Sequence, residues 1–512
     1  MIPFKYLKNN PKIPLIIIII FLLNFLWVYP GFSHDKVNHK ELTVLFTNDI
    51  HDQLKPFDTK DEKNIGGMAT IAFIFEKIRK EKPFSTLVLD AGDYFQGSPL
   101  YNFFKGEIDL KVMSMAGYDA TIVGNHDLDD GIDNLRKQSQ YTSFPILCAN
   151  LTDENDLLIF RPFNIFRVNG LNIGVIGLLG KEAWSVVGVK LKTGLKFLEP
   201  LETLKKVVPI VREYSDIVIL LSHSGHEDDM KFGTEISGID IIIGSHSHKV
   251  IEEPVFIPNK NENGINGTIM QQAGCNGMYV GRIDLEIENN KIIKNYKGVL
   301  IPVKVEMGVK PEINTEIAKY SDQIEEKMNI IIGENTEDID ATQKYKGESD
   351  LGNLITDVMR NKFNTDIAFV NSGGIRSDLP KGKIQVKTIY KILPFENSIV
   401  TFKCNGEKIK KILEMNTERF GKQGTFQFSG IKCVIVNGKV TEITVNDKKL
   451  DLNKVYSVAT VDFIFDGGEK YNFKEGATDV YYTGIPLRDI FINYIKEVKK
   501  IKVPQSGRLI IK

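Results

Sequence analysis

The stretch "ELTVLFTNDIHDQL", residues 41–54, shows the pattern from which the fold can be predicted. It starts with a short apolar run, Leu42 to Phe46, and ends in Asp49 and His51, whose side chains can bind metal ions. Four later apolar runs end in the same way: 87–89 before Asp93, 120–123 before Asn125 and His126, 217–221 before His223, and 239–243 before His246 and His248. One Asp-x-His ending carries little information, but its repetition indicates a shared site.

The apolar runs are short, rich in β-branched residues and apolar on both faces, which is typical of central strands covered on both sides. Helix-like segments lie between them, such as "MATIAFIFEKIRKEK" (68–82), where Ile71, Ile74, Phe75 and Ile78 recur at helical spacing. Alternating strands and helices predict an α/β fold with parallel strands and a ligand site at their carboxyl edge. The polar endings should therefore meet in space although they are far apart in the sequence.

Histidine usage supports a metal site. The chain has eight histidines, of which five stand at these endings and none follows His248. A pair of divalent cations needs a bridging carboxylate, mixed nitrogen and oxygen ligands, and open positions for water and phosphate. Two aspartates neutralise only part of the metal charge, so the site would attract a phosphate group. Histidine-rich ligation favours zinc, manganese, iron or cobalt over magnesium, and the native metal stays open.

Charge excludes one class of partner. The 512 residues include 65 basic and 66 acidic side chains, for a net charge of -1, and no basic stripe stands out. This balance argues against a nucleic-acid polymer as partner and favours a small-molecule substrate. The four cysteines, Cys148, Cys275, Cys404 and Cys433, lack zinc-ribbon spacing, and a Cys404–Cys433 disulfide stays open.

The N-terminus has the character of an export signal. Lys5, Lys8 and Lys12 precede the apolar run "IPLIIIIIFLLNFLWV", and small residues follow at Gly31 and Ser33. We expect a signal peptide over residues 1–33, cleaved after Ser33, and a protein in the periplasm or at the cell surface. An uncleaved anchor is the alternative, and it would be the one contact with a membrane. The apolar run is shorter than the roughly 20 residues that a spanning helix needs.

The segments "TNDIH", "GDYFQGS", "GNHDLD", "SHSGH" and "GSHSH", in this order, resemble the calcineurin-like metallophosphoesterase superfamily and, more narrowly, the 5′-nucleotidase/UDP-sugar hydrolase family. The resemblance implies a four-layer αββα metal domain and a separate α+β C-terminal domain. It assigns Asp49, His51 and His248 to one metal, Asn125, His223 and His246 to the other, and Asp93 to a bridge between them. It also makes His126, paired with Asp129, the catalytic histidine. Asp52 departs from the family, which usually has Gly there, and Asp127 stands where Glu is usual.

The second half contains no histidine and resembles the family's C-terminal substrate domain through "NSGGIR", "LPF" and "DF…GG". The resemblance implies a base clamp of two phenylalanines and a nucleoside-binding turn, formed by Asn371, Gly373, Gly374, Arg376, Phe395, Phe463 and Glu469. Lys344 and Lys346 stand near a position where the family often has Arg, and Glu469 replaces a shorter Asp, so the preferred nucleotide stays open. We expect a metallophosphoesterase domain at 41–305, a linking helix at 310–335 and a nucleotide-specificity domain at 336–512.

The expected function is an exported two-metal phosphoesterase that hydrolyses nucleoside 5′-monophosphates to nucleoside and phosphate, with UDP-sugars or other nucleotide diphosphates as further substrates. The main alternative is a 2′,3′-cyclic nucleotide 2′-phosphodiesterase/3′-nucleotidase. A thiosulfohydrolase-like sulfate-ester hydrolase is disfavoured by the predicted base clamp. A non-catalytic nucleotide-binding surface protein is disfavoured because every predicted ligand and the His126–Asp129 pair are present. The oligomeric state is not predicted.

Overall fold

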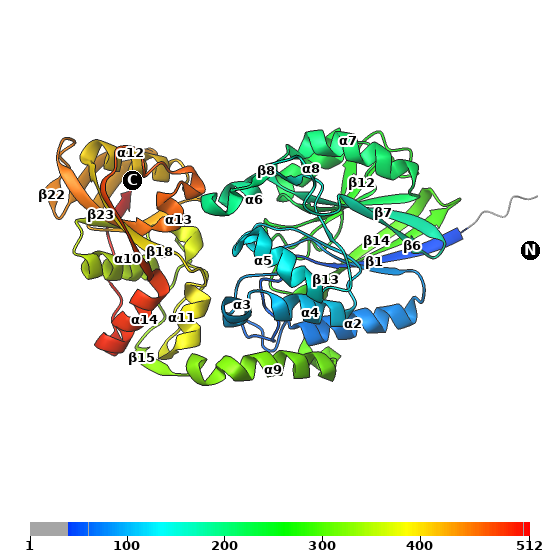
Figure 1. Ribbon diagram of the computed structural model, residues 1–512, viewed down its shortest axis with the longest axis horizontal. Coiled ribbons are helices and arrows are strands. Elements are labelled where there is room, and N and C mark those ends of the chain that lie inside the picture. The colour runs from blue at the N-terminus through cyan, green and yellow to red at the C-terminus, as the bar shows by residue number, and fades with distance from the viewer. Residues whose placement is uncertain (1–38, 60, 505) are drawn as a thin grey trace, which may run out of the picture.

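The computed structural model describes residues 39–512 except 60 and 505, and it forms two lobes (Figure 1). The predicted signal peptide, residues 1–33, lies outside the described residues. Among those that are described, no helix is both long and apolar enough to span a membrane.

Two sheets form the centre of the N-terminal lobe. The first has the order β14-β13-β1-β2, and the second has the order β11-β12-β10-β9-β7-β6. The strands of the first are β1 (His39–Thr47), β2 (Thr86–Asp90), β13 (Tyr279–Glu288) and β14 (Ile292–Pro302). Those of the second are β6 (Phe163–Val168), β7 (Leu171–Leu179), β9 (Ile217–His223), β10 (Ile241–Gly244), β11 (Val255–Pro258) and β12 (Gly267–Gln271). The predicted parallel pairing is found between β1 and β2 and among β7, β9, β10 and β12.

The two sheets pack face to face, and helices cover both outer faces. Val44, Phe46, Ile219 and Ile243 are fully buried between the sheets. On the outer face of the first sheet lie α2 (Met68–Glu81) and α4 (Glu107–Ala116), and on that of the second lie α7 (Pro200–Glu213) and α8 (His226–Glu235). This confirms the expected αββα sandwich. The residue pattern alone had suggested one sheet edge, whereas the polar endings come from two sheets whose carboxyl ends meet.

Short elements complete this lobe. They are α3 (Pro99–Phe104), β3 (Thr121–Ile122), η1 (His126–Leu128), α5 (Gly131–Gln138), η2 (Ser139–Tyr141), β4 (Ile146–Leu147), β5 (Leu151–Asp153), α6 (Lys181–Val186), η3 (Val189–Lys192), β8 (Leu195–Phe197) and η4 (Val305–Met307). An isolated parallel bridge between Leu89 and Ala120 places β3 beside β2, so that the loop after β3 joins the same edge.

The C-terminal lobe is a separate α+β unit around a sheet of order β19-β16-β23-β18-β24, with two smaller sheets, β17-β15-β25 and β22-β21-β20-β26. Its strands are β15 (Ile331–Asn335), β16 (Ile367–Asn371), β17 (Gly382–Gln385), β18 (Ser398–Asn405), β19 (Phe426–Ser429), β20 (Ile431–Val436), β21 (Lys439–Val445), β22 (Lys448–Lys449), β23 (Val455–Val461), β24 (Thr478–Pro486), β25 (Lys500–Ile501) and β26 (Leu509–Ile511). Its helices are α10 (Asp350–Phe363), η5 (Ser372–Gly374), α11 (Val386–Ile392), α12 (Gly406–Thr417), α13 (Asp462–Phe465), η6 (Gly468–Lys470) and α14 (Leu487–Val498). The four cysteines are free thiols, so the disulfide left open between Cys404 and Cys433 is not formed.

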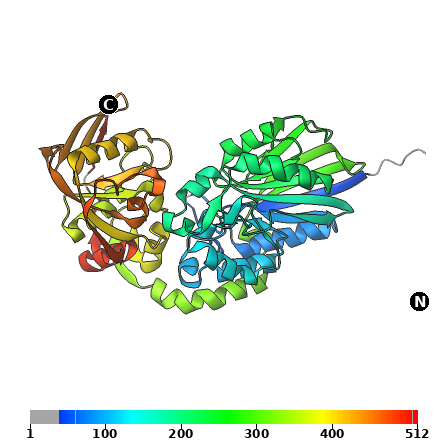
Figure 2. The same cartoon turned by 45° about the horizontal axis from the view of Figure 1, so that its top comes forward.

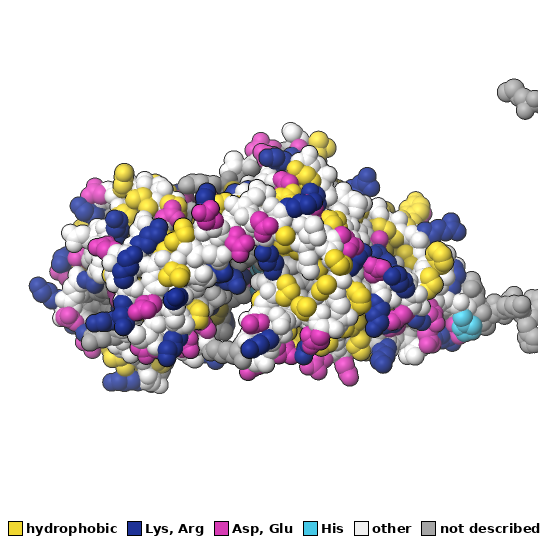
Figure 3. Space-filling model, turned by 90° about the horizontal axis from the view of Figure 1, so that it is seen from below, with side chains coloured by type: hydrophobic (Ala, Val, Ile, Leu, Met, Phe, Trp, Pro, Cys, Tyr) yellow, Lys and Arg dark blue, Asp and Glu magenta, His cyan; other side chains and the backbone are white. Residues whose placement is uncertain are grey.

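The helix α9 (Pro311–Met328) lies beneath the N-terminal lobe, and its C-terminal end leads into the C-terminal lobe (Figure 2). Its buried face, which includes Ile313, Ile317 and Ile324, packs on α2 and α4, and its other contacts include α11 of the C-terminal lobe. The lobes also touch between α3 and α11 and between α6 and η6. On the face seen in Figure 3, basic and acidic side chains are mixed, in keeping with the balanced net charge.

Candidate active site

Five of the predicted metal-binding residues have a left-handed backbone. Their φ values are 51° for Asp49, 51° for His51, 57° for Asp93, 69° for His246 and 55° for His248. Residues other than glycine adopt this conformation at a cost, and such residues cluster at functional sites. The chain bends sharply after each strand, and these bends aim the side chains into one space.

The first group of candidate ligands is Asp49, His51 and His248. The Nε2 atoms of His51 and His248 lie 3.1 Å apart, and His248 Nε2 lies 3.4 Å from Asp49 Oδ1. The backbone N–H of His246 and the Ser245 hydroxyl donate to the Asp49 carboxylate, at 3.1 Å and 2.9 Å. Those bonds tie the end of β1 to the end of β10, so that both sheets build the group.

The second group is Asp93, His223 and His246, with Asn125 beside it. His223 Nε2 lies 3.2 Å from Asp93 Oδ2 and 3.1 Å from Asn125 Oδ1. The Nδ1 atom of His223 donates to the Ala91 carbonyl at 3.0 Å, which leaves Nε2 as the nitrogen that can bind a cation. Asp93 Oδ2 is also 4.0 Å from His51 Nε2, so Asp93 lies between the two groups.

Burial and charge prepare most of these groups for a cation. Burial lowers the pKa of His51 well below its ordinary value and that of His246 to about 3. Burial alone would raise the pKa of Asp93, but His223 and His126 hold it well below the ordinary range. Neutral imidazoles and ionised carboxylates are the forms that bind metals.

The pKa values of His223 and His248 are raised instead. Burial would lower both, but Asp93 raises the pKa of His223 to about 9 and Asp49 raises that of His248 to about 10. A cation must displace those protons. The buried Nε2 of His246 has no hydrogen-bond partner among the described residues, as expected of a ligand atom. The donor set therefore fits two divalent cations.

Asp127, which stands where the family usually has Glu, organises the turns around Asp93. Its buried carboxylate accepts hydrogen bonds from the backbone N–H groups of Asp93, Phe95 and Gly124, at 3.0, 3.1 and 2.7 Å. Gly124 is needed for a steric reason, since a Cβ there would lie 2.5 Å from the Asp93 nitrogen and overlap its carboxylate. Asp127 and Gly124 thus fix Asp93 against the Asn125–His126 turn.

The predicted catalytic pair is formed. His126 Nδ1 and Asp129 Oδ2 are 2.8 Å apart, and the backbone N–H of His126 donates to Asp93 Oδ1 at 2.8 Å. The ring of Phe395, from the other lobe, is stacked on His126 with centroids 5.6 Å apart and an interplanar angle of 25°. The Arg376 guanidinium lies 6.0 Å from the centre of the Phe395 ring. The two lobes thus bring the predicted catalytic histidine next to part of the predicted base clamp.

The "NSGGIR" turn gathers the polar part of the C-terminal site. Asn371 Nδ2 donates to Glu469 Oε1 at 3.3 Å, and a Cβ on Gly374 would lie 2.9 Å from Asn371 Oδ1. Asn371 Oδ1 and Glu469 Oε2 are buried acceptors without a partner among the described residues, so a ligand with hydroxyl or amino donors would satisfy them. Burial raises the pKa of Glu469 to about 7, against the lowering effects of Asn371 and Arg419.

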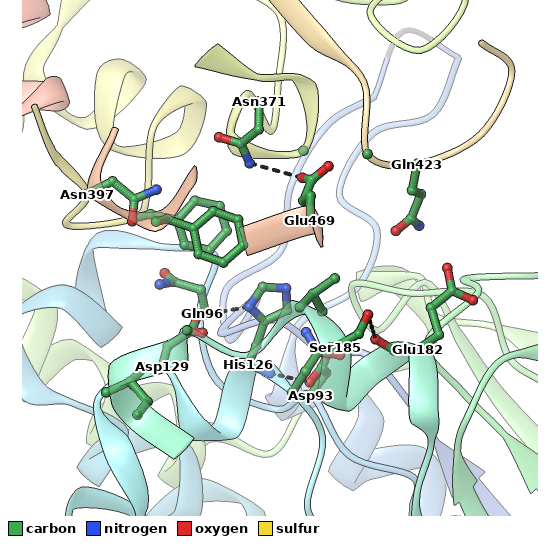
Figure 4. A pocket seen from close by; sticks show the side chains of 18 of the residues that line it. Asp93, Gln96, His126, Asp129, Glu182, Ser185, Asn371, Asn397, Gln423 and Glu469 are labelled. Carbon is green, nitrogen blue, oxygen red and sulfur yellow. Dashed lines mark hydrogen bonds and ion pairs between the residues drawn. The ribbon is translucent and has the colours of Figure 1, made fainter. Parts of the chain in front are cut away.

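One cavity of about 810 Å³ joins these parts between the lobes (Figure 4). Figure 4 shows Asn371 and Glu469 on one side of the cavity and His126, Asp129 and Asp93 on the other. The predicted residues that line it are Asp93, Asn125, His126, Asp129, His246, His248, Asn371, Gly373, Arg376, Phe395, Phe463 and Glu469. Asp49, His51, His223 and Gly374 are not among its lining residues. Lys344 does not line it either, because its ammonium group donates to the Ile375 carbonyl.

The sequence did not reveal several polar residues of this cavity. They include Gln96, Asn102, Tyr345, Asn397, Arg419 and Gln423. Gln96 stands inside "GDYFQGS" and could have been suspected from that position. The others are single polar residues in segments without a metal-binding or glycine-rich pattern, so only the fold brings them to the site.

Two family models match the chain. One describes calcineurin-like phosphoesterases and matches residues 42–250, and the other describes the C-terminal domain of 5′-nucleotidases and matches residues 329–475. A 5′-nucleotidase of Vibrio cholerae is 27% identical over 513 residues, which cover 90% of this chain and 91% of that protein. Protein UshA of Escherichia coli is 27% identical and covers 92% of this chain and 94% of its own length. The crystal structure of a 5′-nucleotidase precursor from Thermus thermophilus has a TM-score of 0.84 at 27% identity, over 92% of this chain and 99% of that one.

Proposed function

This chain belongs to the 5′-nucleotidase/UDP-sugar hydrolase family of calcineurin-like metallophosphoesterases and is a metal-dependent phosphoester hydrolase, and we propose that it hydrolyses nucleoside 5′-monophosphates to nucleoside and phosphate. The observation that carries the proposal is the shared cavity between the lobes. One lobe contributes four of the candidate metal ligands, Asp93, Asn125, His246 and His248, and the other contributes residues of the "NSGGIR" turn and Phe463. We propose the corresponding division into a metallophosphoesterase domain (41–305), a linking helix and a nucleotide-specificity domain (336–512). The linking helix, expected over 310–335, ends at Met328, because residues 331–335 form the strand β15, which pairs with β17 and β25 in the C-terminal lobe.

The proposed roles in the metal centre follow the two groups. One divalent cation would be held by Asp49, His51 and His248, and the other by Asn125, His223 and His246. Asp93 would contribute to both sites. When bound, zinc, manganese or cobalt ions would supply the Lewis acidity that polarises a phosphoryl group and activates water. The protein's part is to keep the ligand side chains rigid through the Asp127 and Ser245 hydrogen bonds.

His126 is the proposed catalytic residue. Because its Nδ1 is paired with Asp129, Nε2 is the nitrogen left for the substrate. From there it would stabilise the negative charge that develops on the phosphoryl oxygens and help the leaving ribose oxygen to depart. The Asp129 carboxylate would hold the imidazole ring in place.

The nucleoside would bind to the C-terminal lobe. We propose that Phe395 and Phe463 stack on the base and that Glu469 and Asn371 accept hydrogen bonds from the ribose or the base. Burial is the main cause of the lowered pKa of His51, and the Arg376 guanidinium adds to it from the other lobe. That position near the metal centre suits a group that also attracts the phosphate. Gly373 and Gly374 leave room for the nucleoside, since a Cβ at either position would approach Asn371 or Glu469.

The proposal includes UDP-sugars and other nucleotide diphosphates as further substrates. The cavity lies in the upper part of the usual range of about 300–1,000 Å³ for small-molecule sites, which leaves space beside a mononucleotide.

The test is the release of phosphate from AMP, UDP-glucose, 2′,3′-cyclic AMP and bis-p-nitrophenyl phosphate, each with and without prior chelation. We expect metal-dependent hydrolysis of AMP at the highest kcat/KM. A clear preference for 2′,3′-cyclic AMP would indicate a cyclic-nucleotide phosphodiesterase instead. Hydrolysis of none of the four substrates would contradict the proposed activity.

We also propose that the protein is exported, on the strength of the basic and apolar segments before residue 34. Periplasmic or cell-surface protein whose N-terminal sequence starts after Ser33 would support export with cleavage. Intact Met1 in the membrane fraction would favour the anchor.

A further inference from the structure

The short helix α3 is fixed to the metal half of the site through Asp52. The Asp52 carboxylate accepts hydrogen bonds from the Ser98 N–H at 3.2 Å, the Ser98 hydroxyl at 2.6 Å and the Tyr101 N–H at 2.8 Å. The Ser98 hydroxyl in turn accepts from the Leu100 N–H and caps the helix, and Pro99 begins it. Asp52 directly follows the candidate ligand His51, so α3 cannot move without disturbing that ligand's neighbour. Asp52, which stands where the family usually has Gly, thus holds α3 next to the candidate metal ligands.

The other end of α3 contacts the C-terminal lobe. The side-chain N–H of Asn102 donates to the Pro394 carbonyl at 2.8 Å, across the boundary between the lobes. Arg488 donates to the same carbonyl at 2.9 Å from within the C-terminal lobe. Next to Asn102, the exposed ring of Phe103 is stacked on Tyr390 of α11, with centroids 6.1 Å apart. Figure 1 shows α3 facing α11 at this point.

A charged contact completes the junction. The Lys105 ammonium lies 3.7 Å from Glu396 across the lobe boundary and 3.1 Å from Asp130 of its own lobe. Phe395 stands between Pro394 and Glu396, so α3 and the Lys105 that follows it contact both of its sequence neighbours. The ring of Phe395 is the one stacked on His126. The place of that ring therefore depends on contacts made at the end of α3.

We propose that Asn102 is a positioning residue which, through α3, fastens the segment 394–396 to the metal half and so holds Phe395 over His126. The inference rests on the proposed nucleotide substrate, because Phe395 is half of the proposed base clamp. The Asn102 side chain is only 8% exposed, which shields its bond to Pro394 from competing water. Breaking this bond would let the clamp drift from the metal centre while the ligands stay in place.

The test compares two variants with a matched control. Asn102→Ala removes the donor to Pro394, and Phe103→Ala removes the stacked ring from a position exposed enough to keep the fold. The control is Phe84→Ala, which removes an aromatic ring that is 90% exposed. We expect Asn102→Ala to raise the KM for AMP about 3- to 10-fold, the factor that corresponds to the usual net free energy of one hydrogen bond. Phe103→Ala should raise it by a similar factor. Cleavage of p-nitrophenyl phosphate, which has no base, should stay within about 2-fold of wild type in Phe103→Ala and Phe84→Ala. In Asn102→Ala the KM for AMP should rise more than the KM for p-nitrophenyl phosphate.

A second measurement needs no substrate. Amide hydrogen exchange of the ligand-free protein should be faster across residues 393–398 in both variants and unchanged in the control. Unchanged exchange and an unchanged KM for AMP would overturn the proposal, and so would equal losses on both esters. If wild type cleaves p-nitrophenyl phosphate but not AMP, the proposed function fails, while hydrogen exchange still decides whether Asn102 fastens the segment.

Discussion

The Phe463→Ala substitution separates recognition of the base from the chemistry at phosphorus. Phe463 lines the cavity at the start of α13 and is only partly buried, and its ring packs on the turn at Gly468, where a Cβ would meet it at 2.7 Å. Stacking of a base on an aromatic ring contributes about 1–3 kcal/mol. Since about 1.4 kcal/mol corresponds to a factor of ten, the KM for AMP should rise about 5- to 150-fold.

The assay follows initial rates of phosphate release from AMP and of colour from p-nitrophenyl phosphate, together with metal content and thermal unfolding. The base-free ester should be cleaved almost as by wild type, because Phe463 belongs to neither group of candidate ligands. Phe463→Trp, which keeps an aromatic face, should recover most of the affinity for AMP. If Phe463→Ala damages both substrates equally while the protein stays folded and metal-loaded, the clamp is refuted, and Phe463 is a packing residue of the C-terminal lobe.

Four further outcomes test the rest of the site. Exhaustive chelation should abolish activity and added Mn²⁺, Co²⁺ or Zn²⁺ should restore it; full activity in protein shown by elemental analysis to be metal-free would contradict the metal centre. His126→Asn should lower kcat about 10²- to 10⁴-fold with both metal equivalents retained, so loss of an equivalent would make His126 a ligand. Gly124→Ala should displace Asp93 and lower the bound metal as measured by elemental analysis, because a Cβ there overlaps the Asp93 carboxylate. Since burial raises the pKa of Glu469 to about 7, its ionised, hydrogen-bond-accepting form is lost as pH falls below that value. The KM for AMP should therefore rise between about pH 7.5 and 6 relative to that for p-nitrophenyl phosphate, and Glu469→Gln should flatten this difference.

The sequence predicted the parts of the site that follow a repeated rule. Apolar runs that end in Asp, Asn or His indicate parallel strands with a common edge, so the meeting of Asp49, His126 and His246 could be foreseen. The division of those strands between two sheets could be expected only from the family resemblance, because a strand buried on both faces has the same residue pattern in either arrangement.

Residues that act through hydrogen bonds to backbone groups were the least predictable. Asp127 and Asn102 matter because of the backbone groups that they meet, Gly124 N–H and the Pro394 carbonyl among others, and those groups are present at nearly every position in a sequence. Lys344 illustrates the converse, since it stands near a position where the family often has Arg, yet its ammonium group is bonded to the Ile375 carbonyl. Only the course of the backbone in space decides such cases.

The pairing of β1 with β13 has a consequence for how the chain acquires its structure. β1 is an inner strand, yet its partner on one side, with Leu42 opposite Leu285, is synthesised long after β1 itself. Until then β1 carries an apolar, unpaired edge that can join other chains. Such distant pairing slows folding and lengthens the time during which the nascent chain is prone to aggregate. The Asp49 carboxylate is held by Ser245 and His246, which are also synthesised long after β1. Binding of metal should therefore be a late event in folding, and chaperones that shield β1 should increase the yield of active protein.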